Sequence, residues 1–434
     1  MRHQPSRSPS GPSRRQVIGT AAAALAAPLV VPGSALGKNG TVAPSERIIM
    51  AGVGIGNRGS SDLHWAMEEA DVQFVAICDA RKDRRDAVKA IIDKKYGTSD
   101  CAQFRDYREF FAKRTDVDAV IIATSERWHA AMGVAAMRAG KDVYSEKPAC
   151  MTIADGRVLA DTAHRLGRVY QSGTQRRSEA NFIFCNELAR TGRLGKIHTV
   201  YAHMYGGSLT HDWLPAEPEP DKEELDWDLW LGPIPWRPYN KRYTRGGWHG
   251  QYDMHTGSVG EWGSHTVSQC QMGIDADDTS AIEYSSAPKQ DGDGLVATFA
   301  NGIKCVFALK GWHGSCGVKY EGTEGWVSCA DGYAAPDLSN KALLADFKKL
   351  VNDYTARTQR PTNHMRDLLN CVRTRRTTVS NAETAHRTMT TCHAANISIW
   401  LGRPLKWDPV KEEFIDDAEA NRLRSRAARE PYQI

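Results

Sequence analysis

The stretch RIIMAGVGIGNRG (Arg47–Gly59) decides the fold expected for this 434-residue chain. It passes from a short apolar β-segment through a glycine-rich turn into the start of a helix. In that order, backbone N–H groups and the helix dipole face a pyrophosphate. Two registers of G-x-G-x-x-G fit: one starts at Gly52 and has Asn57 in the third glycine position, and the other starts at Gly54 and keeps all three glycines. The stretch predicts a dinucleotide-binding turn with contacts from Gly52, Gly54, Ile55, Gly56 and Asn57.

A second apolar segment, VQFVAIC (Val72–Cys78), ends on an acidic residue, Asp79. In dinucleotide-binding folds a carboxylate in this region binds the hydroxyls of the adenosine ribose. An acid there favours NAD over NADP, but Arg81 and Lys82 beside it suit a 2′-phosphate and leave NADP open. Asp79 is also a candidate N-cap for a helix predicted over 81–96, and the two roles are compatible.

The alternation of strand and helix continues along the next hundred residues. Apolar segments at 117–123 and 142–145 alternate with helical segments at 127–139 and 153–166. Nearly continuous apolar strands separated by helices indicate a parallel sheet covered on both faces. The N-terminal part is therefore predicted to be an α/β domain, a Rossmann fold with a doubly wound parallel sheet.

The pattern changes at Lys196, where amphipathic strands begin. Helices predicted over about 362–374 and 382–399 return across these strands. The pattern predicts a C-terminal α+β domain with an open, largely antiparallel sheet whose inner face the helices cover. The expected strands are 197–204, 281–284, 295–299, 304–309 and 325–329.

The first residues resemble a targeting segment. Ser13-Arg14-Arg15 precedes the small and apolar run 17–31, which is typical of a twin-arginine signal peptide, predicted here over residues 1–37. A disordered basic tail or an uncleaved anchor remains the alternative. The twin-arginine route carries folded proteins, which would let a nucleotide be acquired in the cytoplasm before export to the periplasm. The remaining boundaries are placed at 38–172 (nucleotide-binding domain), 173–400 (substrate-binding domain) and 401–434 (C-terminal tail).

Composition excludes several classes of protein. With 41% hydrophobic and 25% charged residues and a formal net charge of +4, the chain is an ordinary globular one. The mature part has no apolar run long enough to span a membrane and no basic stretch interleaved with aromatics, so neither a membrane span nor a nucleic-acid partner is expected. The 10 cysteines are scattered singly, which argues against a zinc ribbon or a disulfide scaffold.

Several longer motifs resemble one known family. They are TSERWH (Thr124–His129), AGKDVYSEKP (Ala139–Pro148), SGTQRRS (Ser172–Ser178), WDLWLGPIPWRPY (Trp227–Tyr239) and GSVGEWGSH (Gly257–His265). Together they are similar to the glucose–fructose oxidoreductase/inositol dehydrogenase/MocA (Gfo/Idh/MocA) family, and most closely to its secreted, twin-arginine-exported branch. The resemblance implies an NAD(P)-dependent oxidoreductase acting on a sugar or sugar derivative, and a homo-oligomer.

The resemblance also assigns roles to individual residues. Lys147 corresponds to the lysine that lies beside the nicotinamide and binds the substrate hydroxyl, and His265 corresponds to the base that removes the hydroxyl proton. Glu261 stands where the family has an aspartate; its extra methylene moves the carboxylate by about a bond length, which puts the family's geometry in doubt. Further cofactor contacts are expected from Thr124, Ser125, Trp128, His129, Glu146, Lys147, Gln175 and Arg176.

The long segment between the first two C-terminal strands is rich in tryptophan and histidine. Its tryptophans suit either a carbohydrate pocket or a packed crossover: Trp213, Trp227, Trp230, Trp236 and Trp248. Its histidines and acids raise a metal alternative, but their spacing matches no standard zinc motif, so no metal is predicted. The candidates for that alternative are His203, His211, His249, His255, His265, Asp212, Asp253 and Glu261.

Two other functions remain open. One is an NAD-dependent glycosidase that passes through a transient keto-sugar on the same fold. The other is a non-catalytic carbohydrate-binding protein on a Rossmann scaffold, which the departures at Asn57 and Glu261 would allow. The presence of bound nicotinamide nucleotide separates the enzymes from the binding protein.

Overall fold

The computed structural model describes residues 42–285 and 292–434. The chain divides into two compact units, Met1–Arg47 and Ile48–Ile434. In the first unit the described part contains one short 3-10 turn, Pro44–Glu46; the predicted signal peptide, residues 1–37, lies outside the described residues. Within the described ranges no helix combines the length and the apolar character that crossing a membrane requires. The following description concerns the second unit.

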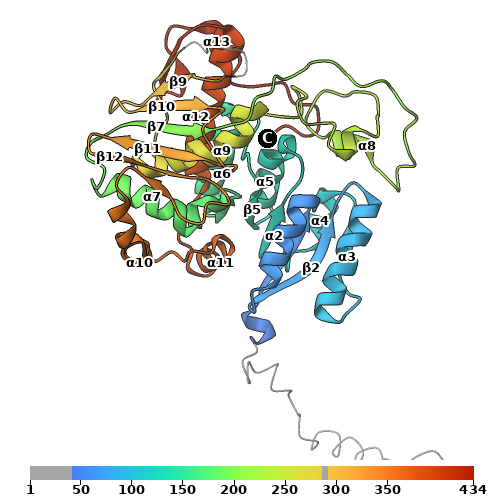
Figure 1. Ribbon diagram of the computed structural model, residues 1–434. Helices are drawn as coiled ribbons and strands as arrows, with labels where there is room; N and C mark the ends of the chain where they lie inside the picture. The colour runs from blue at the N-terminus through green and yellow to red at the C-terminus, as the bar shows by residue number, and fades with distance from the viewer. Residues whose placement is uncertain (1–41, 286–291) are drawn as a thin grey trace, which may run out of the picture. The chain divides into compact units, whose positions relative to one another are not determined.

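The N-terminal part of this unit is built on a six-stranded parallel sheet (Figure 1). The strand order is β3-β2-β1-β4-β5-β6, with the crossover after β3 that defines a doubly wound nucleotide-binding sheet. The predicted Rossmann fold is confirmed. The strands are β1 (Ile48–Val53), β2 (Val72–Cys78), β3 (Ala102–Phe104), β4 (Ala119–Ile122), β5 (Asp142–Ser145) and β6 (Tyr170–Ser172).

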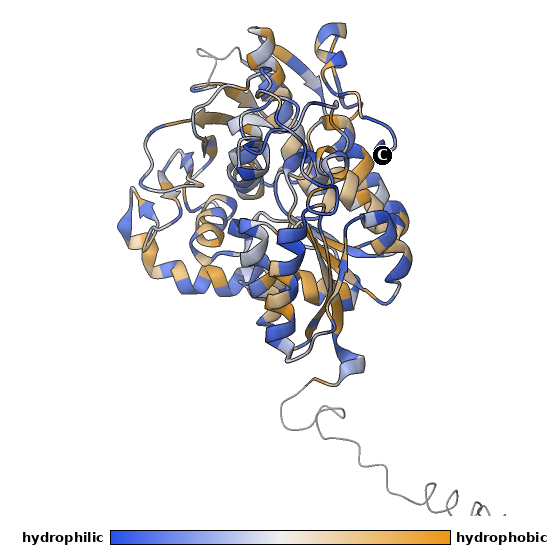
Figure 2. Ribbon diagram, turned by 90° about the vertical axis from the view of Figure 1, so that its right-hand side faces the viewer, coloured by the Kyte–Doolittle hydropathy of each residue, from blue (hydrophilic) through white to orange (hydrophobic). Residues whose placement is uncertain are grey.

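Burial explains why these segments are continuous apolar runs. Every residue of β4 and β5 is buried, because helices cover both faces of the sheet. Figure 2 shows the strands of this sheet coloured mostly as hydrophobic, with hydrophilic positions on the surrounding helices. The helices are α2 (Asn57–Met67), α3 (Lys82–Tyr96), α4 (Tyr107–Lys113), α5 (His129–Arg138) and α6 (Ile153–Leu166), with a 3-10 turn η3 (Glu126–Trp128).

The C-terminal part forms a nine-stranded sheet in the order β13-β12-β11-β7-β10-β9-β8-β14-β15. Its only parallel neighbours among the described strands are β7 and β10, so the predicted open, largely antiparallel sheet is confirmed. The strands are β7 (Ile197–His203), β8 (Glu283–Tyr284), β9 (Val296–Thr298), β10 (Lys304–Ala308), β11 (Val318–Gly322), β12 (Gly325–Cys329), β13 (Asp337–Leu338), β14 (Leu405–Asp408) and β15 (Glu413–Phe414).

Helices cover one face of this sheet and join it to the Rossmann part. Helix α9 (Gly257–Gly273) packs on β7, β10 and β11, and α12 (Ala382–Leu401) lies between α9 and α6. Gly263 allows the close approach of α9 and α12, since a Cβ at this position would lie 2.7 Å from Sγ of Cys392. The other helices are α7 (Ala180–Arg190), α8 (Trp227–Leu231), α10 (Phe347–Thr358), α11 (His364–Thr374) and α13 (Ala418–Arg422), with 3-10 turns η4 (Gln175–Ser178), η5 (Tyr243–Arg245) and η6 (Lys341–Asp346).

Candidate active site

The glycine turn after β1 is shaped for a phosphate. Gly54 has φ +66°, and a Cβ there would collide with Thr124, so only glycine fits. A Cβ at Gly56 would meet nothing within 4 Å, whereas one at Gly59 would lie 2.7 Å from Cβ of Ala123 on the neighbouring strand segment. These are the three tasks of the fingerprint: a tight turn, open space at the phosphate and close helix–strand packing. The register that starts at Gly54 therefore explains the glycines.

This turn opens into a cleft of about 730 Å³. Helix α2 begins there at Gly56 without a side-chain cap, so its dipole faces the cleft. The volume and the uncapped helix fit a dinucleotide. Of the residues predicted to bind cofactor, those that line the cleft are Gly54, Gly56, Asn57, Asp79, Thr124, Ser125 and Trp128.

Asp79 lies at the end of β2, on the wall where an adenosine ribose would bind. Burial raises the pKa of this carboxyl to about 6, against the hydrogen bond that the Arg81 backbone N–H donates to it. The N-cap of α3 is Arg81 itself, so the alternative that Asp79 caps this helix is wrong. The two cations beside it are engaged: Arg81 with Asp83 and the Thr244 carbonyl, and Lys82 with Asp86.

The cleft has a second wall that the sequence did not indicate. Trp230 of α8 and Trp248 come from the tryptophan-rich segment and line the same cleft as the glycine turn. The buried guanidinium of Arg127 stacks 4.1 Å from the centre of the Trp230 ring and donates to the carbonyls of Trp230 and Leu231. Trp227 is buried and stacks on Trp230. The segment thus packs on itself and also covers the nucleotide cleft.

Lys147 and Glu261 meet where the two halves of the unit join. Lys147 follows β5 and is joined to Pro148 by a cis peptide bond, and its Nζ lies 3.5 Å from Oε1 of Glu261 in the first turns of α9. His265 follows Glu261 by one helical turn, so both side chains lie on the same side of α9. The three residues with predicted catalytic roles therefore come from both halves and gather at one place.

His265 is held as a neutral base. Its ring is buried, and Nδ1 has no hydrogen-bond partner among the described residues. Burial, with the positive charges of Arg176 and Lys147 next in importance, lowers the pKa of His265 well below its ordinary value. The shift favours the neutral form of this imidazole.

The remaining predicted residues support this place rather than line the nucleotide cleft. Glu146 accepts hydrogen bonds from Arg58 and Gln175, and His129 contacts the carbonyls of Thr124 and Pro148. Gly52 lies within β1, and Ile55 packs beneath the turn against it. Arg176 forms an ion pair with Asp331, 2.6 Å between Nη2 and Oδ2, and so connects η4 to the large sheet.

A series of aromatic contacts leads from Lys147 toward the large sheet. The Lys147 ammonium lies 5.4 Å from the centre of the Trp262 ring, and Trp262 packs edge-on against Tyr205. His203 at the end of β7 stacks with Trp312 and contacts Tyr205. Aromatic faces next to a cation suit a polyhydroxylated ring, whose apolar face stacks while its hydroxyls bond to charged groups.

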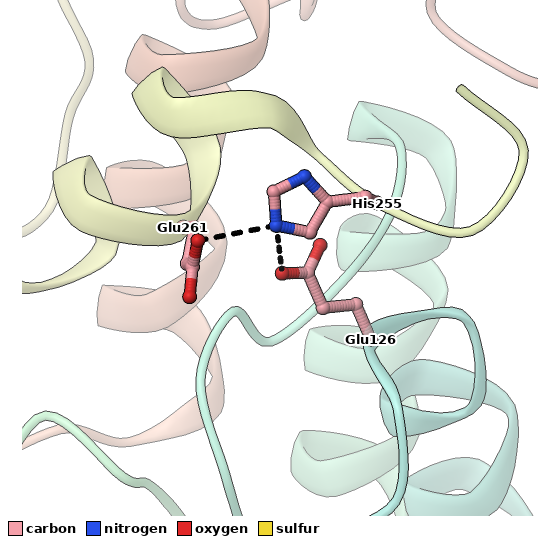
Figure 3. A group of neighbouring side chains, drawn as sticks. All are labelled: Glu126, His255 and Glu261. Atoms are coloured by element: carbon pink, nitrogen blue, oxygen red, sulfur yellow. Dashed lines mark hydrogen bonds and ion pairs between the residues drawn. The ribbon is translucent and has the colours of Figure 1, made fainter. Parts of the chain in front are cut away.

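Glu126, His255 and Glu261 form a tight cluster (Figure 3), and Lys147 contacts its Glu261. Nε2 of His255 lies 3.1 Å from Oε2 of Glu261 and 3.3 Å from Oε1 of Glu126. The sequence did not single out Glu126, although it sits within the motif TSERWH; nothing in that motif indicates that its side chain points across to residue 256. The three ligand atoms lie within 4.8 Å of one another.

A hydrogen bond to His255 indicates whether a proton or a metal ion suits the space between the three side chains. The Gly257 backbone N–H donates to Nδ1 of His255 at 3.1 Å, so the neutral ring carries its hydrogen on Nε2, toward the two carboxylates. A histidine that binds a metal through Nε2 carries the hydrogen on Nδ1 instead. The arrangement favours a shared proton. The other candidates for a metal site do not join this group: His203, His211, His249, His265, Asp212 and Asp253.

Two family models match the chain: "Oxidoreductase family, NAD-binding Rossmann fold" over residues 47–174, and "Oxidoreductase family, C-terminal alpha/beta domain" over residues 204–434. Inositol 2-dehydrogenase of Salmonella typhimurium is 31% identical over 163 residues, 37% of this chain and 47% of that protein. Alpha-N-acetylgalactosaminidase of Shewanella oneidensis is 34% identical over 146 residues, 31% of each chain. This chain thus spans less than half of the length of either relative.

Solved structures show the same fold at low sequence identity. The WlbA dehydrogenase of Bordetella pertussis, crystallised with NADH and UDP-GlcNAcA, superposes with a TM-score of 0.61 at 16% identity, covering 84% of this chain and 98% of that one. Myo-inositol 2-dehydrogenase of Lactobacillus plantarum gives a TM-score of 0.57 at 14% identity, covering 83% and 99%. With the family models, the cleft and the glycine turn in agreement, the chain belongs to the Gfo/Idh/MocA oxidoreductase family and carries its NAD-binding Rossmann domain.

Proposed function

We propose that this protein oxidises a hydroxyl group of a sugar or sugar derivative by hydride transfer to NAD⁺ bound in the cleft. The observation that carries this proposal is the meeting of Lys147, Glu261 and His265 at the junction of the two halves. Bound NAD⁺ supplies the hydride acceptor. The chain itself supplies a cation, a base and a carboxylate for the substrate carbinol.

Each residue has a separate task in the proposed reaction. The Lys147 ammonium donates a hydrogen bond to the substrate oxygen and stabilises the negative charge that develops on it. Neutral His265 accepts the hydroxyl proton as the C–H hydride leaves, so the products are a carbonyl, a protonated imidazole and the reduced cofactor. Glu261 holds Lys147 in place through the 3.5 Å ion pair.

A sugar-like substrate is supported by the walls of the site. Trp262 lies beside the Lys147 ammonium, and the aromatic contacts continue from Trp262 through Tyr205 and His203 to Trp312. The related proteins are named for inositol and for a galactosaminide. An N-acetylgalactosaminidase among the relatives also supports a redox-neutral cycle, in which a transient keto-sugar allows a glycosidic bond to be cleaved before the same hydride returns to the sugar.

We also propose export and tight cofactor retention. The support for export is the twin-arginine pattern at Arg14-Arg15 and the apolar run after it. Outside the cytoplasm free nicotinamide cofactor is scarce, and the cover formed by Trp230, Trp248 and residues 244–249 suits a nucleotide carried along with the folded protein. A fractionation experiment with Arg14→Lys and Arg15→Lys together should leave the protein in the cytoplasm.

A homo-oligomer through the open face of the large sheet is part of the same proposal. The face opposite the helices carries half-buried groups that already interact, with Lys319 over the rings of Tyr201 and Trp326. Light scattering of the purified protein should give a mass that is a multiple of the chain mass. A monomer at micromolar concentration would contradict this part of the proposal.

The decisive experiment starts from the purified protein without added nucleotide. Denaturation should release NAD, which mass spectrometry would detect. In the native protein, absorbance at 340 nm should rise when the right sugar from a panel of inositols, aldoses and N-acetylhexosaminides is added. His265→Asn should keep the nucleotide and lose the absorbance change. A protein that neither contains nor binds NAD or NADP would instead support a carbohydrate-binding role.

A further inference from the structure

We propose that His255 is a positioning residue, which holds the Glu261 carboxylate against Lys147 and is itself anchored by Glu126 of the Rossmann half. The inference deepens the proposed function and rests on it, because the benefit of a fixed Lys147 is in the hydride-transfer step. The sequence raised His255 only as a candidate metal ligand and did not single out Glu126. The proposal explains how this site works with a glutamate in the position of the family's aspartate.

The two oxygens of Glu261 have different partners. Oε1 lies 3.5 Å from Nζ of Lys147, and Oε2 lies 3.1 Å from Nε2 of His255. A glutamate has one more rotatable bond than an aspartate, so a carboxylate held at one oxygen only would swing away from the lysine. The second contact removes that freedom. His255 thus restores at Glu261 the fixed geometry that a shorter side chain would have by itself.

Glu126 fixes His255 from the other half of the unit. This buried carboxylate receives hydrogen bonds from the backbone N–H of Thr256 (2.6 Å) and from its Oγ1 (2.8 Å), while its other oxygen faces Nε2 of His255. Asn396 of α12 donates to the Thr256 carbonyl, and a Cβ at Gly260 would collide with the Thr256 side chain. The series of contacts from η3 to α9 is therefore held by packing as well as by hydrogen bonds.

The cluster combines acidic and basic side chains whose electrostatic effects on one another can be traced. Two carboxylates, Glu126 and Glu261, face Lys147 and His255. Burial opposes the charged ring, but Glu126 and Glu261 outweigh it and raise the pKa of His255; burial likewise opposes the charged form of Glu261, but His255 and Lys147 lower its pKa to about 2. The other titratable groups near the cluster are His249, whose ring centre is 5.4 Å from that of His255, and Arg426 and His129, which face Glu126.

The first test is independent of any substrate. Nuclear magnetic resonance of the full-length protein labelled with ¹⁵N-histidine, with His255 assigned by loss of its signal in His255→Gln, should show the Nε2–H tautomer above the histidine pKa. That pKa should exceed the value of an exposed histidine and should fall in Glu126→Gln and in Glu261→Gln. An Nδ1–H tautomer, or a pKa unmoved by both substitutions, would overturn the inference. So would stoichiometric zinc or manganese bound to His255.

The second test uses the sugar that reduces the bound nucleotide in the panel. His255→Ala should lower kcat by roughly 10–100-fold, because small misplacements of catalytic groups have effects of that size. His255→Gln, whose amide N–H still reaches a carboxylate, should recover most of the activity. In His255→Ala the acid limb of the kcat/KM profile should move to higher pH, as Glu261 loses the partner that lowers its pKa.

Matched variants separate positioning from general damage. His198→Gln alters an exposed histidine on β7 and should match the wild type in every measurement. Glu261→Asp should lower kcat in the wild-type background but change it little in His255→Ala, since the contacts of Glu261 with Lys147 and with His255 are coupled. Independent, additive effects would refute the role of His255. If no sugar is oxidised, the proposed function fails, while the tautomer and the pKa still decide whether the cluster exists.

Discussion

Nζ of Lys147 lies 3.5 Å from Oε1 of Glu261, although Lys147 follows strand β5 of the Rossmann sheet and Glu261 lies in the first turns of α9 in the C-terminal part. The contact places the ammonium at the junction of the two halves. In the proposed reaction the Rossmann half would hold the nucleotide and supply the cation, and α9 would supply the carboxylate and the base. Loss of either half of the pair should therefore affect chemistry rather than nucleotide binding.

Lys147→Met should lower kcat by about 10²–10⁴-fold, because the alkoxide loses its stabilising charge while the aliphatic stem remains. Affinity for NAD, measured by calorimetry, should change little, since Lys147 does not line the nucleotide cleft. Lys304→Met, on the exposed part of β10, serves as the control. Full activity in Lys147→Met would remove the lysine from the mechanism.

Asp79→Ala should weaken binding of NAD by about tenfold, which corresponds to about 1.4 kcal/mol for the lost ribose contact. Binding of NADP should be affected much less, because a 2′-phosphate gains nothing from a carboxylate and Arg84 lines the same cleft. Titration of both nucleotides into nucleotide-free protein measures the change. An equal loss for both nucleotides would place the ribose elsewhere.

Trp230→Ala should speed the dissociation of NAD by about 3–10-fold, the effect of losing an aromatic contact worth roughly 0.5–1.5 kcal/mol. The ring lines the cleft and is held by Arg127 and Trp227. Displacement of bound NADH followed by fluorescence gives the rate. Trp236→Ala, at a half-exposed tryptophan outside the cleft lining, should leave the rate unchanged.

Asp62→Asn should stabilise the protein, and more at pH 8 than at pH 4. Burial, with Glu146 next, raises the pKa of Asp62 to about 8 although Arg58 opposes the shift. A raised pKa in the folded state gives a contribution that is complete below the unfolded pKa of 3.8 and is lost as the pH rises to about 8. The gain should reach on the order of 1–3 kcal/mol in denaturant unfolding.

The matched control for this stability effect is Asp100→Asn, at an exposed aspartate after α3. Its stability should follow the wild type at both pH values. A variant Asp62→Asn that loses stability equally at pH 4 and pH 8 would mean that Asp62 is charged in the folded protein.

The fold was largely predictable because its strands carry either continuous or alternating apolar patterns. Strand β11 was missed, since Val318–Gly322 follows a run of glycine, serine and cysteine that gives no period. The two-residue strands β13 and β15 are too short to have a pattern at all. Residues 401–434, expected as a tail, contribute β14 and β15 to the large sheet, where the buried Trp407 packs on Phe414.

Local spacing and the family resemblance made part of the site predictable. Glu261 and His265 lie four residues apart on one helix, so their convergence follows from local spacing. The pair Glu126 and His255 depends on how the two halves dock, and the cover by Trp230 depends on the path of a long segment without regular structure. Such contacts are set by tertiary packing and leave no period in the sequence.

The hydrogen bonds from Thr256 to Glu126 constrain how a nucleotide enters and leaves. To swing the halves apart, the molecule would have to strip a buried carboxylate of its donors, which costs several kcal/mol. We expect the nucleotide to enter and leave only past the segment 244–249, which lines the cleft. A bound dinucleotide should therefore stay through many turnovers. An enzyme that keeps its cofactor in this way must reoxidise it in place: the electron pair taken from one sugar has to be returned to a molecule in the same site before the next round begins.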